Sequence, residues 1–139
     1  IANKGWFYTP HFVKNSNRKK NYTGIEKKHF NPVIDGMKRV VNETGGTARL
    51  ARIDNVSICG KTGTVQNPHG KDHSVFIAFA PVDSPRIAIA VFIENSGFGG
   101  TWAAPTASLM IEKYLTNKVL DKEKENRIIN ANLLNSNNK

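Results

Sequence analysis

The stretch Lys61-Thr62-Gly63-Thr64 combines a cation, two hydroxyl groups and a glycine in four consecutive residues. The β-branched and small residues of 56–59 come directly before it and predict a strand that continues through the stretch. Alternation along a strand puts Thr62 and Thr64 on one face, with hydroxyls about 7 Å apart, and Lys61 on the other. This arrangement suits an anionic acyl donor that lies along the strand. The two hydroxyls can donate hydrogen bonds to it, the lysine adds positive charge from beneath, and the glycine has no side chain to keep it away.

Two serines match the Ser-x-x-Lys pattern of a lysine-activated nucleophile. Ser16 precedes Lys19 in this way, and Ser136 precedes Lys139 while also matching Ser-x-Asn. Such a serine must sit at the start of a buried helix, where the lysine one turn later is desolvated enough to take its proton. Asparagines and cations flank both serines, and neither has an apolar face, so we reject both as nucleophiles.

Residues 67–73 bring together His69, Asp72 and His73, three residue types that bind metal ions. The set lacks a fourth ligand and a regular element to fix it. The alternatives are the rim of a substrate cleft and an ordinary polar hairpin loop, and we favour the polar loop. We expect no metal site.

Residues 95–101 are glycine-rich and join a predicted strand to a predicted helix, as phosphate-binding loops do. The spacing Gly97-x-Gly99-Gly100 does not complete the dinucleotide fingerprint, and no Lys-Ser or Lys-Thr pair follows as in a P-loop. We therefore expect no nucleotide and no other cofactor.

Two further strands are predicted to hold the motif in a sheet. Residues 74–80 and 86–95 are apolar and β-branched, and the turn formers of residues 81–85 join them. Links this short make the three strands an antiparallel meander. Residues 86–95 alternate isoleucine and valine with alanine, which predicts a strand covered on both faces, with a helix approaching closely on the alanine face.

Two amphipathic segments predict helices that pack on this sheet. The first opens with Asn31 as its cap and Pro32 at its first helical position, and ends at Gly45-Gly46. The second runs from about Ala103 to Leu115, with a proline in its first turn. The predicted fold class is α+β, a three-stranded antiparallel sheet with flanking helices.

The two ends of the chain have weaker patterns. Residues 6–13 are aromatic and extended, and we expect them to lie across the core, whereas the polar residues 14–24 predict an exposed connection. Residues 117–139 are rich in Asn, Lys and Glu and predict a mainly polar, partly helical tail. The predicted organisation is one domain over residues 1–116 followed by this tail.

Composition limits the remaining possibilities. The 139 residues, 39% of them hydrophobic, suffice for one core. The formal charge of +9 is uneven, because residues 1–60 carry 11 Lys and Arg against 4 Asp and Glu. These cations are scattered, so we interpret them as a solvated surface and expect no nucleic-acid partner. Cys59 is the single cysteine and predicts a buried small residue, and no apolar run is long enough to span a bilayer.

The motif Lys61-Thr62-Gly63, followed by Thr64, resembles the third motif of the penicillin-recognising serine enzymes. Three longer runs resemble the end of the transpeptidase domain of class B penicillin-binding proteins, of the penicillin-binding protein 2 type: CGKTGTVQNPHGKDHSVFIAFAP, IAIAVFIENSGFGG and AAPTASLMIEKYL. Two more resemble the segments before that motif: IANKGWFYTPHFVK and DGMKRVVNETGGTA. The resemblance covers residues 1–116 and implies a carboxy-terminal fragment of that domain.

The resemblance implies D,D-transpeptidation of peptidoglycan stem peptides, with β-lactams as acyl donors, no cofactor, and a serine nucleophile upstream of this chain. It implies that Thr62 and Thr64 hold the terminal carboxylate, with Gly63 in the same substrate-binding strand. Lys61 would stabilise charge and assist proton transfer, and the Thr64 backbone N–H would complete an oxyanion hole. Val65 departs from the small residue expected there, which bears on the shape of the cleft.

The resemblance also implies a parent protein anchored in the inner membrane with a periplasmic catalytic domain, and a soluble fragment that is inactive without the serine. A β-lactam sensor or a non-catalytic cell-wall-binding module remains an alternative, because sensors share the fold and the motif. In the family, an upstream strand lies beside the strand matching residues 87–93. Without that neighbour we expect the isolated chain to self-associate through this edge.

Overall fold

The structure, a computed structural model, describes residues 1–14 and 18–133 of the chain. Its strands are β1 (Trp6–Tyr8), β2 (Lys20–Tyr22), β3 (Cys59–Val65), β4 (His73–Ala80) and β5 (Ile87–Ile93). Its helices are α1 (Phe30–Asn42), α2 (Ala103–Thr116) and α3 (Lys122–Ile129), with short 3₁₀ helices η1 (Lys27–His29) and η2 (Arg49–Ala51).

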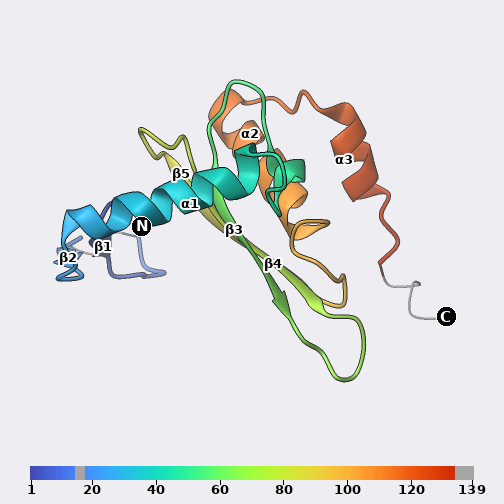
Figure 1. Ribbon diagram of the computed structural model, residues 1–139, viewed down its shortest axis with the longest axis horizontal. Helices are drawn as coiled ribbons and strands as arrows, with labels where there is room; N and C mark the ends of the chain where they lie inside the picture. Colours follow the sequence, from blue (N-terminus) through green and yellow to red (C-terminus); the bar gives the residue numbers. More distant parts are fainter. Residues whose placement is uncertain (15–17, 134–139) are drawn as a thin grey trace.

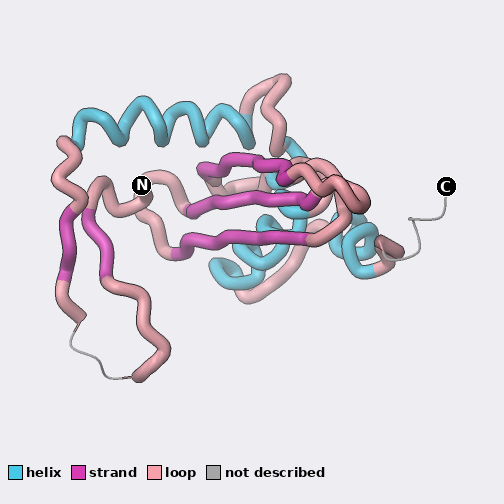
Figure 2. Tube along the Cα trace, turned by 90° about the horizontal axis from the view of Figure 1, so that it is seen from below, coloured by secondary structure: helices cyan, strands magenta, loops and turns pink. Residues whose placement is uncertain are grey.

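The predicted three-stranded antiparallel meander is present, with strand order β3-β4-β5 (Figures 1 and 2). In its register Thr64 lies opposite Ser74, and Ser74 lies opposite Ile93. The strand prediction was wrong for residues 56–58, because β3 begins at Cys59 and Val56 forms only an isolated bridge with Ile53. Among the described residues β3 and β5 each have one neighbouring strand, so each leaves one edge unpaired.

One face of the sheet packs on α2 and forms the main core. Phe76 of β4 is fully buried there against the helix. The helix contributes small side chains, which are also fully buried: Ala103, Ala104 and Ala107, together with Ile111. Because alanine adds only a methyl group, the helix can lie close to the strands while the Phe76 ring fills the space between them.

The other face of the sheet is largely open, which corrects the prediction that helices cover both faces of β5. Ala88 and Ala90 are exposed, whereas the isoleucines and valine of β5 face α2. The close helix contact therefore comes from the alanines of α2 and not from those of the strand. Where β3 begins, Cys59 and Phe79 on this face form a small second cluster with Met37 of α1. Burial raises the pKa of the Cys59 thiol to about 11; the positive charge of Lys38 opposes this shift, and the negative charges of Asp83 and Asp35 add to it.

Helix α1 packs alongside β3 and is offset from the predicted bounds (Figure 2). It begins at Phe30, directly after η1, and not behind an Asn31 cap; it ends at Asn42, three residues before Gly45. Met37 and Val41 are buried one turn apart on the face toward the sheet. The Asn42 side chain donates to the Ile58 carbonyl at 3.1 Å, which fixes the end of α1 against the residues that enter β3.

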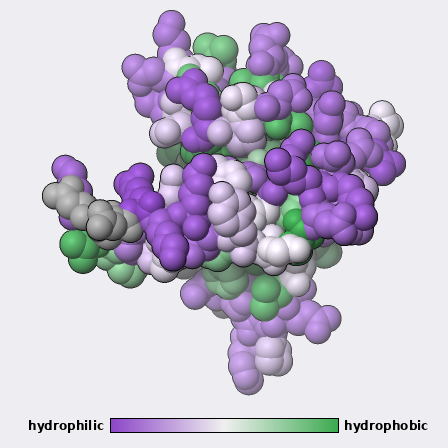
Figure 3. Space-filling model, turned by 90° about the vertical axis from the view of Figure 1, so that its left-hand side faces the viewer, coloured by the Kyte–Doolittle hydropathy of each residue, from purple (hydrophilic) through white to green (hydrophobic). Residues whose placement is uncertain are grey.

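The predicted core position of residues 6–13 was wrong. Trp6–Tyr8 pairs with Lys20–Tyr22 in a separate two-stranded ribbon, so part of the predicted exposed connection is a strand. Phe12 is completely exposed, and Phe7 and Tyr8 are also exposed. The end of the molecule that carries this ribbon has a mostly hydrophilic surface (Figure 3).

The segment predicted as a polar tail contains helix α3, which packs back against α2. Asp121 caps α3 by accepting a hydrogen bond from the backbone N–H of Lys124 at 2.8 Å, and this bond lowers the pKa of the Asp121 carboxyl. The Lys124 ammonium donates to the carbonyl of Arg52 at 3.0 Å. Residues 117–133 are thus partly ordered on the domain, and a domain boundary at residue 116 remains a prediction.

Two glycines give a matched test of this packing. A Cβ at Gly60 would overlap the ring of the fully buried Phe76, whereas a Cβ at Gly36, within α1, would meet nothing within 4 Å. We expect Gly60→Ala to destabilise the fold by about 1–3 kcal/mol through overpacking, and Gly36→Ala to stabilise it by about 0.5–1 kcal/mol. Urea unfolding followed by circular dichroism measures both; equal effects of the two substitutions would contradict the packing described here.

Candidate functional site

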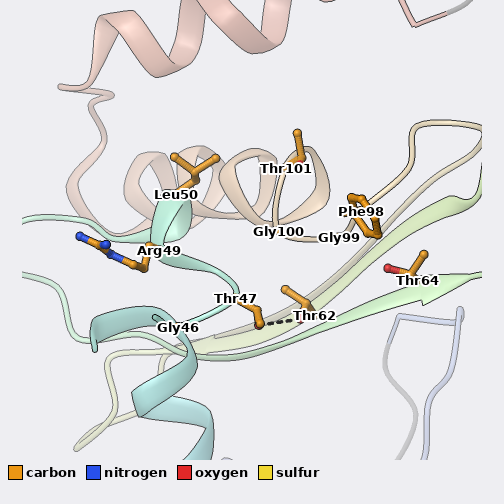
Figure 4. Close-up of a pocket in the computed structure, with 10 residues that line it drawn as sticks. All are labelled: Gly46, Thr47, Arg49, Leu50, Thr62, Thr64, Phe98, Gly99, Gly100 and Thr101. Carbon is orange, nitrogen blue, oxygen red and sulfur yellow. Dashed lines mark hydrogen bonds between the residues drawn. The ribbon is translucent and has the colours of Figure 1, made fainter. Parts of the chain in front are cut away.

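A cleft of about 490 Å³ lies over the Thr62 and Thr64 face of β3 (Figure 4). One wall is β3 itself, and the opposite wall is the loop that leads into α2. The remaining wall comes from the segment between α1 and η2 and from η2. Besides the two threonines, the lining residues are Gly46, Thr47, Arg49, Leu50, Phe98, Gly99, Gly100 and Thr101.

Ser74 ties the loop wall to the sheet. Its buried hydroxyl donates to the Phe98 carbonyl at 3.0 Å and accepts from the Ala103 backbone N–H at 3.0 Å, at the first residue of α2. Ser74 is the register partner of Thr64, so one buried side chain sets the distance between the loop and the motif strand. The hydroxyl uses both its donor and its acceptor capacity in these two bonds.

Two glycines let three backbone segments meet at this point. A Cβ on Gly99 would overlap the backbone of Gly63 and Val75, and a Cβ on Gly100 would overlap the carbonyl oxygen of Thr47. The loop can therefore lie directly on β3 only because both positions lack a side chain. The glycine-rich segment that resembled a phosphate-binding loop is a packing element here.

The two motif threonines differ in their hydrogen bonding. The hydroxyls of Thr62 and Thr47 lie 2.9 Å apart and share a hydrogen bond in which either can donate (Figure 4). Thr64 is exposed, and within residues 1–14 and 18–133 its side chain makes no hydrogen bond. The cleft thus holds one pre-oriented hydroxyl and one hydroxyl available to a ligand.

Lys61 lies on the opposite face of β3 from the two threonines, as strand alternation predicted. It does not line the cleft, and its ammonium donates to the backbone carbonyl of Thr62 at 2.6 Å. Gly63 is on the Lys61 face, with Val75 beside it. Arg49, unlike Lys61, lines the cleft and brings a cation to it. Its side chain extends away from Thr64 (Figure 4).

Two of the residues considered as metal ligands, Asp72 and His73, accept hydrogen bonds from backbone N–H groups instead. Asp72 accepts from the Asn67 backbone N–H at 3.2 Å, and the Nδ1 atom of His73 accepts from the Asn95 backbone N–H at 3.0 Å. The described part of the chain contains no cluster of three or more metal-ligating residues. The rejected serines, Ser16 and Ser136, lie outside the described residues.

Sequence reasoning missed Thr47, Ser74 and the packing role of Gly99-Gly100. Thr47 follows Gly45-Gly46, which was interpreted only as the end of a helix, although glycines also occur where backbone segments approach each other closely. Ser74 is a polar residue inside an otherwise apolar strand, and such a residue needs hydrogen-bond partners when buried.

Known proteins are similar to this chain in both sequence and fold. Residues 1–112 match the family described as "Penicillin binding protein transpeptidase domain". The peptidoglycan D,D-transpeptidase MrdA of Haemophilus influenzae is 37% identical over 107 residues, which cover 66% of this chain and 16% of the relative. MrdA of Acinetobacter baumannii is 31% identical over a match that covers 96% of this chain and 23% of the relative.

Two solved structures have a fold similar to that of this chain. The ceftriaxone acyl-enzyme of penicillin-binding protein A from M. tuberculosis has a TM-score of 0.71 at 27% identity, covering 83% of this chain and 30% of that one. Penicillin-binding protein 2 of Pseudomonas aeruginosa, in complex with WCK 5153, has a TM-score of 0.70 at 31% identity, covering 87% and 29%. None of the helices within residues 1–14 and 18–133 has the length and apolar character needed to cross a bilayer.

The chain spans less than a quarter of the length of these two curated relatives. Its match to the family nevertheless includes the cleft, from Gly46 to Thr101, and the edge strand that carries Lys61-Thr62-Gly63-Thr64. The chain therefore belongs to the penicillin-binding protein transpeptidase domain family.

Proposed function

We propose that this chain supplies the carboxylate-binding wall of a serine D,D-transpeptidase that cross-links peptidoglycan stem peptides. The observation that carries the proposal is the pair of hydroxyls, on Thr62 and Thr64, that line a cleft on an edge strand. The relatives are named peptidoglycan D,D-transpeptidases, which favours catalysis over sensing. The nucleophilic serine, on this proposal, belongs to a part of the protein outside residues 1–139.

The edge strand gives the substrate a place to lie. An extended peptide can pair with the unpaired N–H and C=O groups of β3 as an added strand. Hydrogen bonds from Thr62 and Thr64 to the terminal carboxylate would then fix the peptide along the strand, with its penultimate carbonyl beside the incoming serine. The backbone N–H of Thr64 would donate to the oxyanion that forms when the serine attacks.

Thr47 has a positioning role in this proposal. A threonine hydroxyl carries one hydrogen, so Thr62 can donate to a carboxylate only if Thr47 donates to Thr62 in their 2.9 Å hydrogen bond. A carboxylate in the cleft favours this direction because it accepts the Thr62 hydrogen. Thr47 thereby orients the Thr62 hydroxyl without contacting the substrate itself.

Lys61 would act through its charge. It lies on the opposite face of β3 from the two threonines, and its ammonium donates to the Thr62 carbonyl. When the serine-bearing part of the domain lies beside this edge, the ammonium is available to stabilise developing negative charge and to assist proton transfer. The same arrangement accepts β-lactams, whose carboxylate and carbonyl mimic those of the stem peptide.

Replacing the cation or the hydroxyl of the motif tests this assignment. In a transpeptidase domain that contains this chain together with its serine, Lys61→Ala or Thr62→Ala should lower the second-order acylation rate by β-lactams about 100-fold, because one transition-state contact is worth about 3 kcal/mol. The melting temperature should change little. Tyr114→Ala, at an exposed residue of α2 outside the cleft, serves as the control; unchanged acylation in both motif variants would contradict the assignment.

The positioning role of Thr47 predicts a smaller and more selective effect. Thr47→Val, which keeps the shape and removes the hydroxyl, should lower the acylation rate about tenfold by leaving the Thr62 hydroxyl unoriented. Thr47→Ser should restore the rate. A β-lactam analogue that lacks the carboxylate should respond little to Thr47→Val, and an equal response of both compounds would assign Thr47 a purely structural role.

The isolated chain should not form a covalent adduct with benzylpenicillin. Asparagines and cations flank Ser16 and Ser136, so the sequence predicts no desolvated base of the kind that a serine nucleophile needs. Intact-mass spectrometry after incubation with the drug checks this directly. A stoichiometric penicilloyl adduct that disappears in Ser16→Ala or Ser136→Ala would place the nucleophile within this chain.

A further inference from the structure

Helix α3 bonds to two walls of the cleft that are far apart in the sequence. The Lys124 ammonium donates to the backbone carbonyl of Arg52 at 3.0 Å, and Arg52 is the residue that ends η2. One turn later, the Arg127 guanidinium donates to the backbone carbonyl of Thr101 at 3.1 Å. Two residues of η2 line the cleft on one side, and Thr101 lines it in the loop that leads into α2.

The two cations of α3 are held in place by further contacts. The Lys124 side chain is only 12% exposed and also pairs with Asp121, the residue that caps the helix, at 3.3 Å. The Arg127 guanidinium lies over the ring of Trp102, 5.4 Å from its centroid. A lysine is rarely buried to this extent unless it is paired, and hydrogen bonds from a charged donor are stronger than those between neutral groups.

The connection from α2 fixes where α3 lies. Helix α2 ends at Asn117, whose left-handed backbone turns the chain back. The buried carboxylate of Glu112, in the last turns of α2, then accepts a hydrogen bond from the backbone N–H of Leu120 at 3.3 Å. Burying a carboxylate is costly unless it is hydrogen-bonded, so this bond ties the connection to the helix that packs on the sheet. Helix α3 is therefore a fixed support for the elements that it contacts.

The spacing of the two cations lets one helix hold both walls. Lys124 and Arg127 are three residues apart, so they lie on the same side of α3 and about 4.5 Å apart along its axis. A helix is stiff over this distance, and its bonds to Arg52 and Thr101 therefore set the separation between the η2 wall and the loop wall.

We propose that Lys124 and Arg127 are positioning residues, which hold these two walls at the separation that a bound ligand needs. This role rests on the proposed function, because the ligand is the stem peptide or β-lactam of that proposal. The family match ends at residue 112, so it assigns no role to α3.

Hydrogen exchange tests whether each cation holds its own wall. The backbone N–H groups of Thr101 and Arg52 both donate to backbone carbonyls, so their exchange rates report how often each wall opens. In a transpeptidase domain that contains this chain together with its serine, Arg127→Met should speed exchange at Thr101 about tenfold, because one charge-assisted hydrogen bond is lost. Lys124→Met should have the same effect at Arg52.

Lys122→Met is the matched control for both variants. It removes a cation from the same helix, but the Lys122 ammonium pairs within α3, with Glu125 at 2.6 Å. Exchange at Thr101 and Arg52 should stay unchanged in this variant. Unchanged exchange in Lys124→Met and Arg127→Met, or equal acceleration in Lys122→Met, would overturn the positioning role.

Kinetics test whether the walls matter to a ligand. Pre-steady-state acylation by nitrocefin at several concentrations separates the dissociation constant of the non-covalent complex from the acylation rate constant. Lys124→Met and Arg127→Met should each raise the dissociation constant about fivefold and leave the rate constant unchanged, because the motif on β3 does not move. A merely structural role would lower the melting temperature without changing the dissociation constant.

Thr62→Ala, measured in parallel, separates this role from the proposed function. If Thr62→Ala lowers acylation but neither α3 variant changes the affinity for nitrocefin, the proposed function stands and the positioning role is wrong. If Thr62→Ala has no effect, the proposed function fails, and hydrogen exchange at Thr101 and Arg52 still decides whether α3 holds the walls.

Discussion

The close contact between the Gly99-Gly100 loop and strand β3 is the constraint on which the site depends. Side chains at either glycine would overlap the backbone of Gly63 and Val75 or the carbonyl of Thr47. The contact holds the loop against the motif strand, and the buried hydroxyl of Ser74 fixes its position through bonds to Phe98 and Ala103. A larger residue in this loop would move the cleft wall and with it the space above the two threonines.

The same sheet explains why β3 can display its motif and still be anchored. Gly60 on its α2-facing side packs on the buried Phe76 ring, and α1 packs alongside it, while among the described residues no strand pairs with its outer edge. A substrate-binding strand needs this combination, because a rigid scaffold keeps the hydroxyls in place and an unpaired edge leaves backbone groups available.

Local rules predicted much of this from sequence. Alternation put Thr62 and Thr64 on one face, short turns gave the antiparallel meander, and the alanines and first-turn proline of residues 103–115 gave α2. The misses involve contacts between distant residues. The bond from Thr47 to Thr62 and the bridge made by Ser74 join segments that no local pattern connects. The open face of β5 was missed because alternating apolar residues do not reveal which face a helix covers.

The most direct test of the proposed carboxylate site is a crystal structure of a β-lactam acyl-enzyme formed by a transpeptidase domain that contains this chain. We predict that the drug carboxylate accepts hydrogen bonds of about 2.7 Å from the hydroxyls of Thr62 and Thr64, with Thr47 still bonded to Thr62. We also expect the acyl carbonyl oxygen to lie beside the Thr64 backbone N–H. A carboxylate held elsewhere, with both threonine hydroxyls turned away from it, would contradict the proposed site.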